Sequence, residues 1–188
     1  MISLIFYLLD FEQTHLDVDI HIIAKLSAIA IVLHTAEFFL PSPIFGLKPG
    51  IANVVVLFAY YFFNLSSAVY VSLIRVFISS LILGTFLTPT FFLSFSGALS
   101  SLGCLAIASY FLNKKYFSIY SFSMLMSLGH VVGQFICVRL FIIQDNGVFF
   151  LIPIFIIFAF IFALINAYIV DKIMRVSKSQ IKNDKIYP

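Results

Sequence analysis

The sequence has few charged residues for its length. Asp, Glu, Lys and Arg make up 10% of its 188 residues, against about 25% in ordinary soluble domains. Hydrophobic residues make up 62%, against roughly 45 to 50% in such domains. A soluble domain of this size leaves too large a fraction of its area exposed to hide that much apolar surface. The composition therefore excludes a soluble globular protein and predicts a chain surrounded by lipid.

Cysteine and the usual catalytic motifs are also scarce. Cys104 and Cys137 both lie in apolar runs, where cysteine behaves as a small hydrophobe, so we expect neither a disulfide framework nor a cysteine metal site. The chain contains no G-x-x-x-x-G-K-[ST], H-E-x-x-H or G-x-S-x-G motif. We therefore expect no cofactor, no metal and no nucleic-acid partner, and the chain cannot draw energy from ATP through the first motif.

Acidic residues are almost absent from the apolar part of the chain. Between Ile20 and Gln144 the one acidic residue is Glu37. A cluster of carboxylates is the usual means of holding magnesium against a diphosphate. The sequence therefore argues against diphosphate chemistry in this part of the chain, and whether the protein is an enzyme at all stays open.

Long apolar runs predict six transmembrane helices. At about 20 residues a crossing, six helices use about 120 residues and leave about 68 for ends and connections. The runs are continuously apolar, which favours helices over the alternating strands of a barrel. The fold class expected is an all-α integral membrane bundle. The expected spans lie near residues 22–40, 51–63, 67–83, 91–112, 119–143 and 148–170.

The basic residues indicate how these spans lie in the membrane. We expect an N-terminal interfacial segment over 1–21, a six-helix transmembrane domain over 22–170 and a basic tail over 171–188. An even number of spans places both termini on one side, and basic residues mark the cytoplasmic side. That side would hold Lys114, Lys115, Lys172, Arg175, Lys178, Lys182 and Lys185, with Lys25 close by. The opposite side would hold Lys48, so we predict cytoplasmic termini in a multi-pass protein of the bacterial inner membrane.

A few polar residues lie where lipid should exclude them. An ionisable group inside a span costs about 2.5 to 3.5 kcal/mol on insertion scales, so those that remain usually face protein or water. His130 and Gln134 are four residues apart and share one helix face. We predict one cavity open to the outer side, where Lys48 and Arg75 favour a carboxylate or phosphate ligand. The candidate binding residues are Glu37, Lys48, Asn53, Arg75, His130 and Gln134.

These polar residues also have structural interpretations, which stay open. Arg75 could form an ion pair with Glu37 that only locks two helices together. His130 and Gln134 could hydrogen-bond to neighbouring helices without any ligand. The polar residues expected to be structural are His34, Arg139 and Asn166.

Small residues form two stripes. Ala24 and Ala28 lie four residues apart on the first predicted span, and a second group including Ser96, Gly97 and Ser100 lies on the fourth. Small residues at this spacing let helices approach closely in membranes. Each stripe could therefore pack inside the protein, and that of Ala24 and Ala28 could instead contact a separate partner.

The loop after the first predicted span carries the most specific motif. The segment E-F-F-L-P-S-P begins at Glu37, and G-L-K-P-G-I-A-N ends at Asn53. This pattern resembles the family called Gx transporters or heptaprenyl diphosphate synthase component I, over about residues 22–170. The segment G-H-V-V-G-Q that ends at Gln134 is similar to the family's A-H-N-x-G-Q. Val131 stands where the family usually has Asn, so no polar role carries over to that position.

The resemblance implies a function. The family is similar in span number and length to the substrate-binding subunits of energy-coupling-factor transporters, which bind vitamins from outside and rely on a separate ATP-driven module. We therefore expect a membrane transport protein that takes up a small, anionic or amphipathic solute from the outer face, with such a module as partner. Two alternatives stay open: a noncatalytic membrane component of heptaprenyl diphosphate synthesis, and an assembly subunit of a membrane redox complex.

Overall fold

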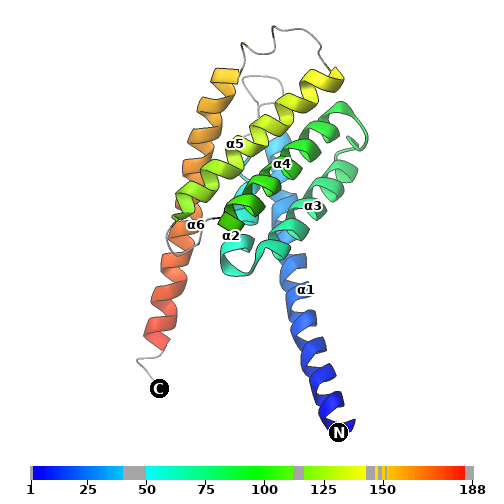
Figure 1. Cartoon of the computed structure of the whole chain (residues 1–188), viewed down its shortest axis with the longest axis vertical. Coiled ribbons are helices and arrows are strands. Elements are labelled where there is room, and N and C mark those ends of the chain that lie inside the picture. Colours follow the sequence, from blue (N-terminus) through cyan, green and yellow to red (C-terminus); the bar gives the residue numbers. More distant parts are fainter. Residues whose placement is uncertain are drawn as a thin grey trace.

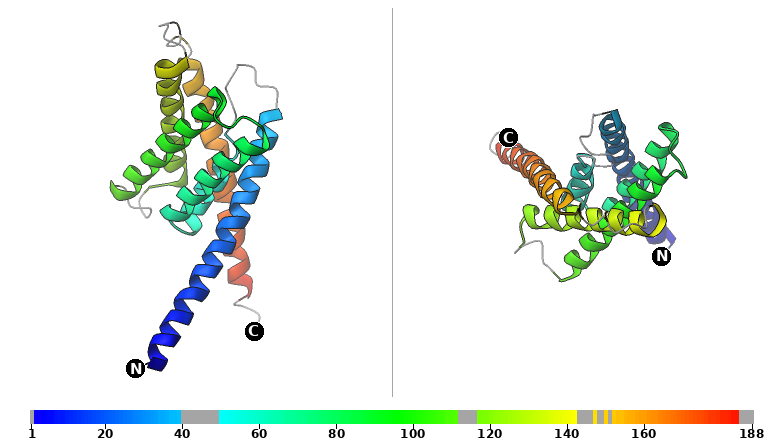
Figure 2. Two further views of the ribbon diagram at one scale, coloured as in Figure 1. Left: turned by 90° about the vertical axis from the view of Figure 1, so that its right-hand side faces the viewer. Right: turned by 90° about the horizontal axis from the view of Figure 1, so that it is seen from above.

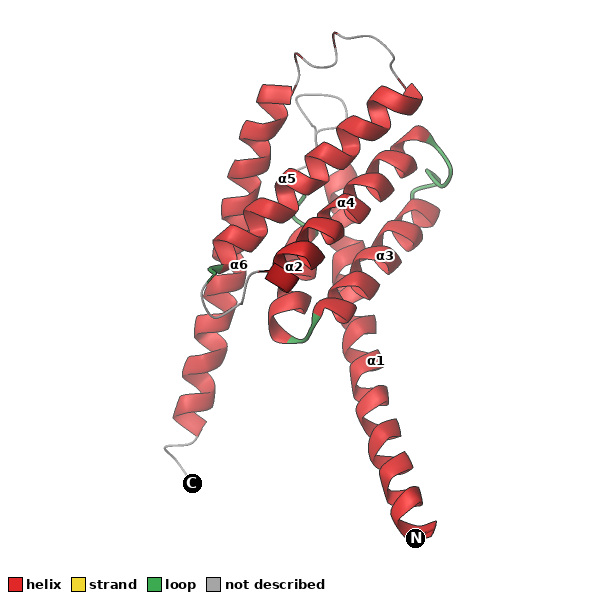
Figure 3. Cartoon of the chain, viewed as in Figure 1, coloured by secondary structure: helices red, strands yellow, loops and turns green. Residues whose placement is uncertain are grey.

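The regular structure is entirely helical. The computed structural model describes residues 2–39, 50–111, 117–142, 147, 150 and 152–184, and within them the side chains of 20–39, 50–111, 117–141, 147, 150 and 152–176. These residues form helices and turns, with no strand among them (Figure 3). The helices are α1 (Ile2–Phe39), α2 (Asn53–Phe62), α3 (Leu65–Ile82), α4 (Pro89–Phe111), α5 (Ile119–Cys137), a π-helical turn (Val138–Ile142) and α6 (Ile152–Asp184).

Five of these helices are long and apolar enough to cross a membrane. Their apolar stretches are Ile20–Phe39, Leu65–Ile82, Pro89–Phe111, Ile119–Phe141 and Ile152–Val176. The prediction of an all-α, multi-pass membrane protein is confirmed at this level. Helix α2 has 10 residues, which is about 15 Å and half the thickness of the hydrocarbon core. The described helices therefore support five spans, and the count of six stays a prediction.

The beginning of α1 and the end of α6 lie at the same end of the molecule (Figure 1). The first half of α1 and the last turns of α6 extend past the other helices at that end (Figures 1 and 2). Helix α1 passes through residue 21 without a break, and α6 passes through residue 171 to Asp184. The segment boundaries expected at these positions, and the cytoplasmic location of the termini, stay predictions.

Local sequence signals fix where several helices begin. The Asn64 side chain accepts a hydrogen bond from the Ser67 backbone N–H at 2.7 Å and caps α3, as Asn does at many helix N-termini. Ser118 caps α5 in the same way. Helix α2 follows a turn in which Asn53 N donates to Gly50 O at 3.0 Å. Gly50 has a φ of +68°, a conformation that glycine adopts without strain.

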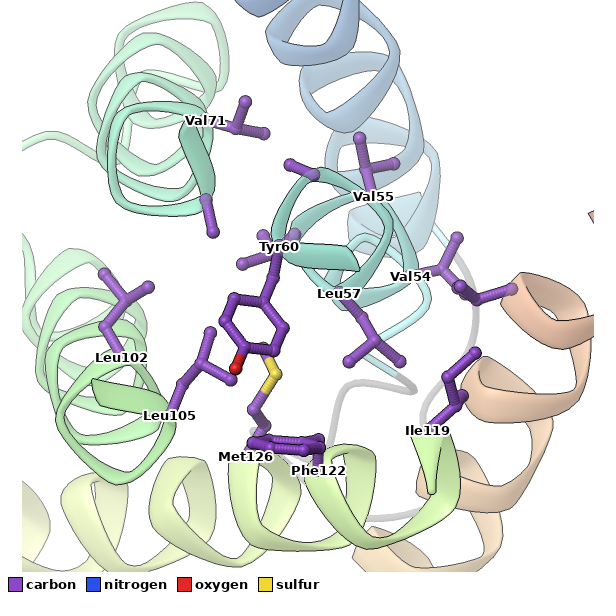
Figure 4. Close-up of a cluster of buried hydrophobic side chains, with 14 of the residues drawn as sticks. Val54, Val55, Leu57, Tyr60, Val71, Leu102, Leu105, Ile119, Phe122 and Met126 are labelled. Carbon is purple, nitrogen blue, oxygen red and sulfur yellow. The ribbon is translucent and has the colours of Figure 1, made fainter. Parts of the chain in front are cut away.

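The short helix α2 lies at the centre of the apolar core. Six of its ten residues are buried, and they meet side chains of α3, α4, α5 and α6 (Figure 4). Tyr60 packs against Phe122 of α5 with ring centroids 5.3 Å apart, next to Leu105 of α4 (Figure 4). The longer helices therefore surround α2.

Glycines bring α4 and α5 into close contact. A Cβ atom added at Gly97 would lie 2.6 Å from the His130 ring, and one added at Gly129 would lie 2.6 Å from Cys104 Sγ. A Cβ added at Gly133 would lie 2.5 Å from the Ser96 carbonyl oxygen and would overlap Ser100. The small residues of α4 thus pack inside the protein, except at Gly103, where an added Cβ would meet nothing within 4 Å.

The α4–α5 contact predicts the effect of one methyl group. We expect Gly133→Ala to lower the free energy of unfolding by about 1 to 3 kcal/mol, because backbone atoms of α4 must move to accept it. The matched control is Gly103→Ala, which adds the same methyl group to open space and should leave stability unchanged or slightly higher. Thermal unfolding of both variants in lipid nanodiscs measures the difference. Equal midpoints for the two variants would contradict the close packing.

Candidate functional site

The start of α2 lies beside the middle of α5. Gly50 and Asn53 line one small cavity together with His130, and His130 is eleven residues from either end of the apolar stretch Ile119–Phe141. A helix start exposes backbone N–H groups that have no partner within the helix. Inside a membrane protein these groups must find acceptors from the protein itself.

Glu37 of α1 supplies one of these acceptors. Its Oε1 accepts a hydrogen bond from the Ala52 backbone N–H at 3.0 Å, and the residue is 4% exposed. Its Oε2 lies 3.9 Å from His34 Nδ1. A carboxylate at the N-terminus of a helix is also favoured by the helix dipole. Glu37 therefore satisfies an amide that would otherwise be unpaired and holds α1 against the start of α2.

Arg75 of α3, which carries the opposite charge to Glu37, also contacts the start of α2. The residue is 3% exposed, and its Nη1 donates to Asn53 Oδ1 at 3.0 Å. Its charge also interacts with that of Glu37. The Nε atom of Arg75 has no hydrogen-bond partner among the described residues. The guanidinium is therefore held by the Asn53 amide, and an ion pair between Glu37 and Arg75 stays a prediction.

Asn166 of α6 completes the arrangement. Its Nδ2 donates to the Gly50 carbonyl at 3.0 Å, across 116 residues of sequence, and it is 3% exposed. We expected Asn166 to have a structural role, and its bond to Gly50 does hold α6 against the start of α2. Asn166 also lines the cavity. Asn166 is the one amide residue in the apolar run 148–170. Nothing in that run shows which face of the helix contacts Gly50, so the sequence could not predict this bond.

The cavity has a volume of about 40 Å³. Its lining combines three phenylalanines of α6 with polar side chains of α2, α5 and α6 and a few small or apolar residues. Its lining residues are Gly50, Asn53, Ser127, His130, Val131, Gln134, Phe155, Phe158, Ala159, Phe162 and Asn166.

The structure brings most of the candidate residues together. Asn53, His130 and Gln134 line the cavity, while Glu37 and Arg75 contact Ala52 and Asn53 at the start of α2. Lys48 lies outside the described residues. Four helices, α1, α3, α5 and α6, thus contribute polar side chains around the start of α2.

A sequence model of heptaprenyl diphosphate synthase component I matches residues 26–173. The chain belongs to this family. The match confirms the resemblance carried by the loop motif that begins at Glu37. No curated protein and no solved structure matches the chain.

Other candidate residues of this family member lie away from the cavity. Ala24 and Ala28 are exposed on α1, and Ala24 lines a groove of about 460 Å³ with Asn64 and Tyr70. Their role as a partner interface stays a prediction. Arg139 lies in the π-helical turn and lines an apolar groove of about 350 Å³ between α5 and α6.

The Glu37 and Arg75 charges predict a coupling between these two residues. We expect Glu37→Gln and Arg75→Met each to destabilise the protein, because each leaves the other charge buried without its counterpart. The double variant should be less destabilised than the sum, by about 0.5 to 3 kcal/mol. Unfolding of the two single variants and the double variant in micelles measures this difference. Pairing Glu37→Gln with the distant Ser109→Ala serves as the control, and additivity in both cycles would contradict the coupling.

Proposed function

We propose that this member of the heptaprenyl diphosphate synthase component I family is a membrane transport protein. It binds a small amphipathic solute from the outer face and takes it up. The observation that carries this proposal is the cavity beside the start of α2, where amides from α2, α5 and α6 face three phenylalanines. A small number of placed polar groups in an apolar pocket is the usual composition of a solute site.

The partners of the two charges favour an amphipathic solute over an anionic one. Glu37 is bound to the Ala52 backbone, and Arg75 is bound to the Asn53 side chain. Neither residue lines the cavity. An entering anion would therefore meet neutral amides first.

Solute binding requires the cavity to widen. Its volume of about 40 Å³ holds roughly three water molecules, at about 10 to 15 Å³ for each. The hydrogen bond between Asn166 and Gly50 ties α6 to the start of α2. We therefore propose that α6 moves away from α2 when the solute enters.

The chain contains no G-x-x-x-x-G-K-[ST] motif, so it cannot draw energy for uptake from ATP through that motif. A separate ATP-driven module would supply it from the cytoplasmic side. The exposed small residues Ala24 and Ala28 lie in the first half of the apolar stretch Ile20–Phe39 of α1, where such a module would approach if both termini are cytoplasmic.

The family name supports a second candidate function. A component of a heptaprenyl diphosphate synthase acts with at least one other component, and the scarcity of carboxylates in the apolar part of this chain makes a noncatalytic role the suitable one. Such a subunit would not need to retain a small solute. The two candidates therefore differ in what the purified protein carries.

Native mass spectrometry of protein extracted gently from its own membrane distinguishes the two functions. We expect one small organic molecule to remain bound, and to be lost from Gln134→Leu, which removes an amide from the cavity. Ser109→Ala on α4 removes a hydroxyl outside the cavity and should retain the molecule. Absence of any bound molecule, together with faster prenyl chain elongation when the protein is added to a soluble synthase subunit, would support the synthase component instead.

A further inference from the structure

We propose that the cavity recognises an uncharged group that both donates and accepts hydrogen bonds, of the carboxamide or urea type, in preference to an anion. The inference rests on the proposed function and names the chemistry of the solute's bound end. It is carried by the orientations of two amide side chains, Asn53 and Asn166, which are fixed by Arg75 and by the Gly50 carbonyl respectively.

The orientation of Asn166 is set by a carbonyl. A side-chain amide has one accepting oxygen and one donating nitrogen, and a backbone carbonyl can only accept. The atom of Asn166 that faces Gly50 O is therefore Nδ2, at 3.0 Å. Its Oδ1 is buried and has no hydrogen-bond partner among the described residues. Asn166, which is one of the lining residues, thus holds a buried acceptor without a partner among the described residues.

The orientation of Asn53 is set by a guanidinium. Arginine can only donate, so the atom of Asn53 that faces Arg75 Nη1 is Oδ1, at 3.0 Å. Its Nδ2 is left as the donor of this lining residue and lies 3.3 Å from the position a Cβ of Gly50 would occupy. Both amides therefore flank Gly50, and together they present one donor and one acceptor.

This pair complements a carboxamide. The ligand's carbonyl oxygen would accept from Asn53 Nδ2, and its N–H would donate to Asn166 Oδ1. A carboxylate in the same place would set one of its oxygens against Asn166 Oδ1 with no hydrogen between two acceptors, and a buried polar group left unpaired is costly. Apart from the titratable ring of His130, every side chain that lines the cavity is uncharged.

The aromatic residues that line the cavity suit an apolar part of the ligand. Phe158 and Phe162 of α6 have rings inclined by 20° with centroids 6.4 Å apart, and Phe155 packs edge-on against Phe135. With room for roughly three water-sized groups, the cavity accepts the polar end of a solute. The apolar remainder would lie along the phenylalanines.

Acetamide and acetate test this inference, because they have nearly the same shape and differ in charge and in the N–H donor. Binding to the protein in lipid nanodiscs is measured at pH 7 by saturation transfer to the methyl group of each probe. We expect acetamide to bind about tenfold more tightly than acetate, since one satisfied hydrogen bond changes affinity by about that factor. Asn166→Leu should weaken acetamide binding by about tenfold.

The matched control is Ser123→Ala. Ser123 Oγ donates to Ala163 O at 2.7 Å, so this variant also loses a buried hydrogen bond to α6 but leaves the cavity unchanged, and acetamide affinity should stay within about twofold. If Asn166→Leu does not fold, Asn53→Asp carries the test. It keeps an oxygen for Arg75, replaces the donor by an acceptor, and should weaken acetamide binding by about tenfold.

Equal or tighter binding of acetate, no binding of either probe, or full acetamide affinity in a folded Asn166→Leu would each overturn the inference. These results concern the bound group alone. Failure of the proposed function appears separately, as the absence of any retained molecule in native mass spectrometry of the wild-type protein.

Discussion

A helix that begins inside a membrane protein must have its first backbone amides satisfied without water. Helix α2 is about half as long as a membrane span, and its start lies beside the middle of α5. The Glu37 carboxylate accepts the Ala52 N–H at this start, and the buried charge of Glu37 in turn requires a compensating charge. Arg75 provides it, so the polar residues of α1 and α3 both follow from the position at which α2 begins.

The same bonds that satisfy α2 also set the chemistry of the cavity. Arg75 fixes the Asn53 amide, and the Gly50 carbonyl fixes the Asn166 amide. Arg75 therefore holds Asn53 in orientation, and neither Arg75 nor Glu37 lines the cavity. The sequence left open whether the polar residues hold helices together or bind a ligand. Both kinds of contact are found at the start of α2, so the two interpretations are compatible.

Much of this arrangement could be predicted from the sequence. Long apolar runs locate the apolar stretches of α1, α3, α4, α5 and α6 to within about six residues, because lipid admits few other solutions. The polar start of α1 and the polar end of α6 continue as helix beyond these runs. Glu37 and Arg75 stand out because a charge in such a run is expensive. The shortness of α2 was visible as well, since the apolar run over 51–63 is shorter than a normal span.

The remaining features depend on contacts between distant parts of the chain. Asn166 meets Gly50 across 116 residues, and nothing in the apolar run around it shows which side of α6 faces α2. The donor and acceptor directions of Asn53 and Asn166 are decided by their partners, so residue identity alone could not give them. The sequence therefore predicted a ligand suited to the charges of Lys48 and Arg75, while the cavity itself presents amides.

The central claim is that the Glu37 carboxylate accepts the Ala52 backbone N–H at the start of α2 within the bilayer. Solid-state NMR dipolar recoupling between ¹³Cδ of Glu37 and ¹⁵N of Ala52, in protein reconstituted into lipid bilayers, measures that contact directly. An N–H···O distance of 3.0 Å predicts strong dephasing that disappears in Ala52→Gly, where position 52 carries no label. Dephasing that is weak, or the same in both proteins, would contradict the account.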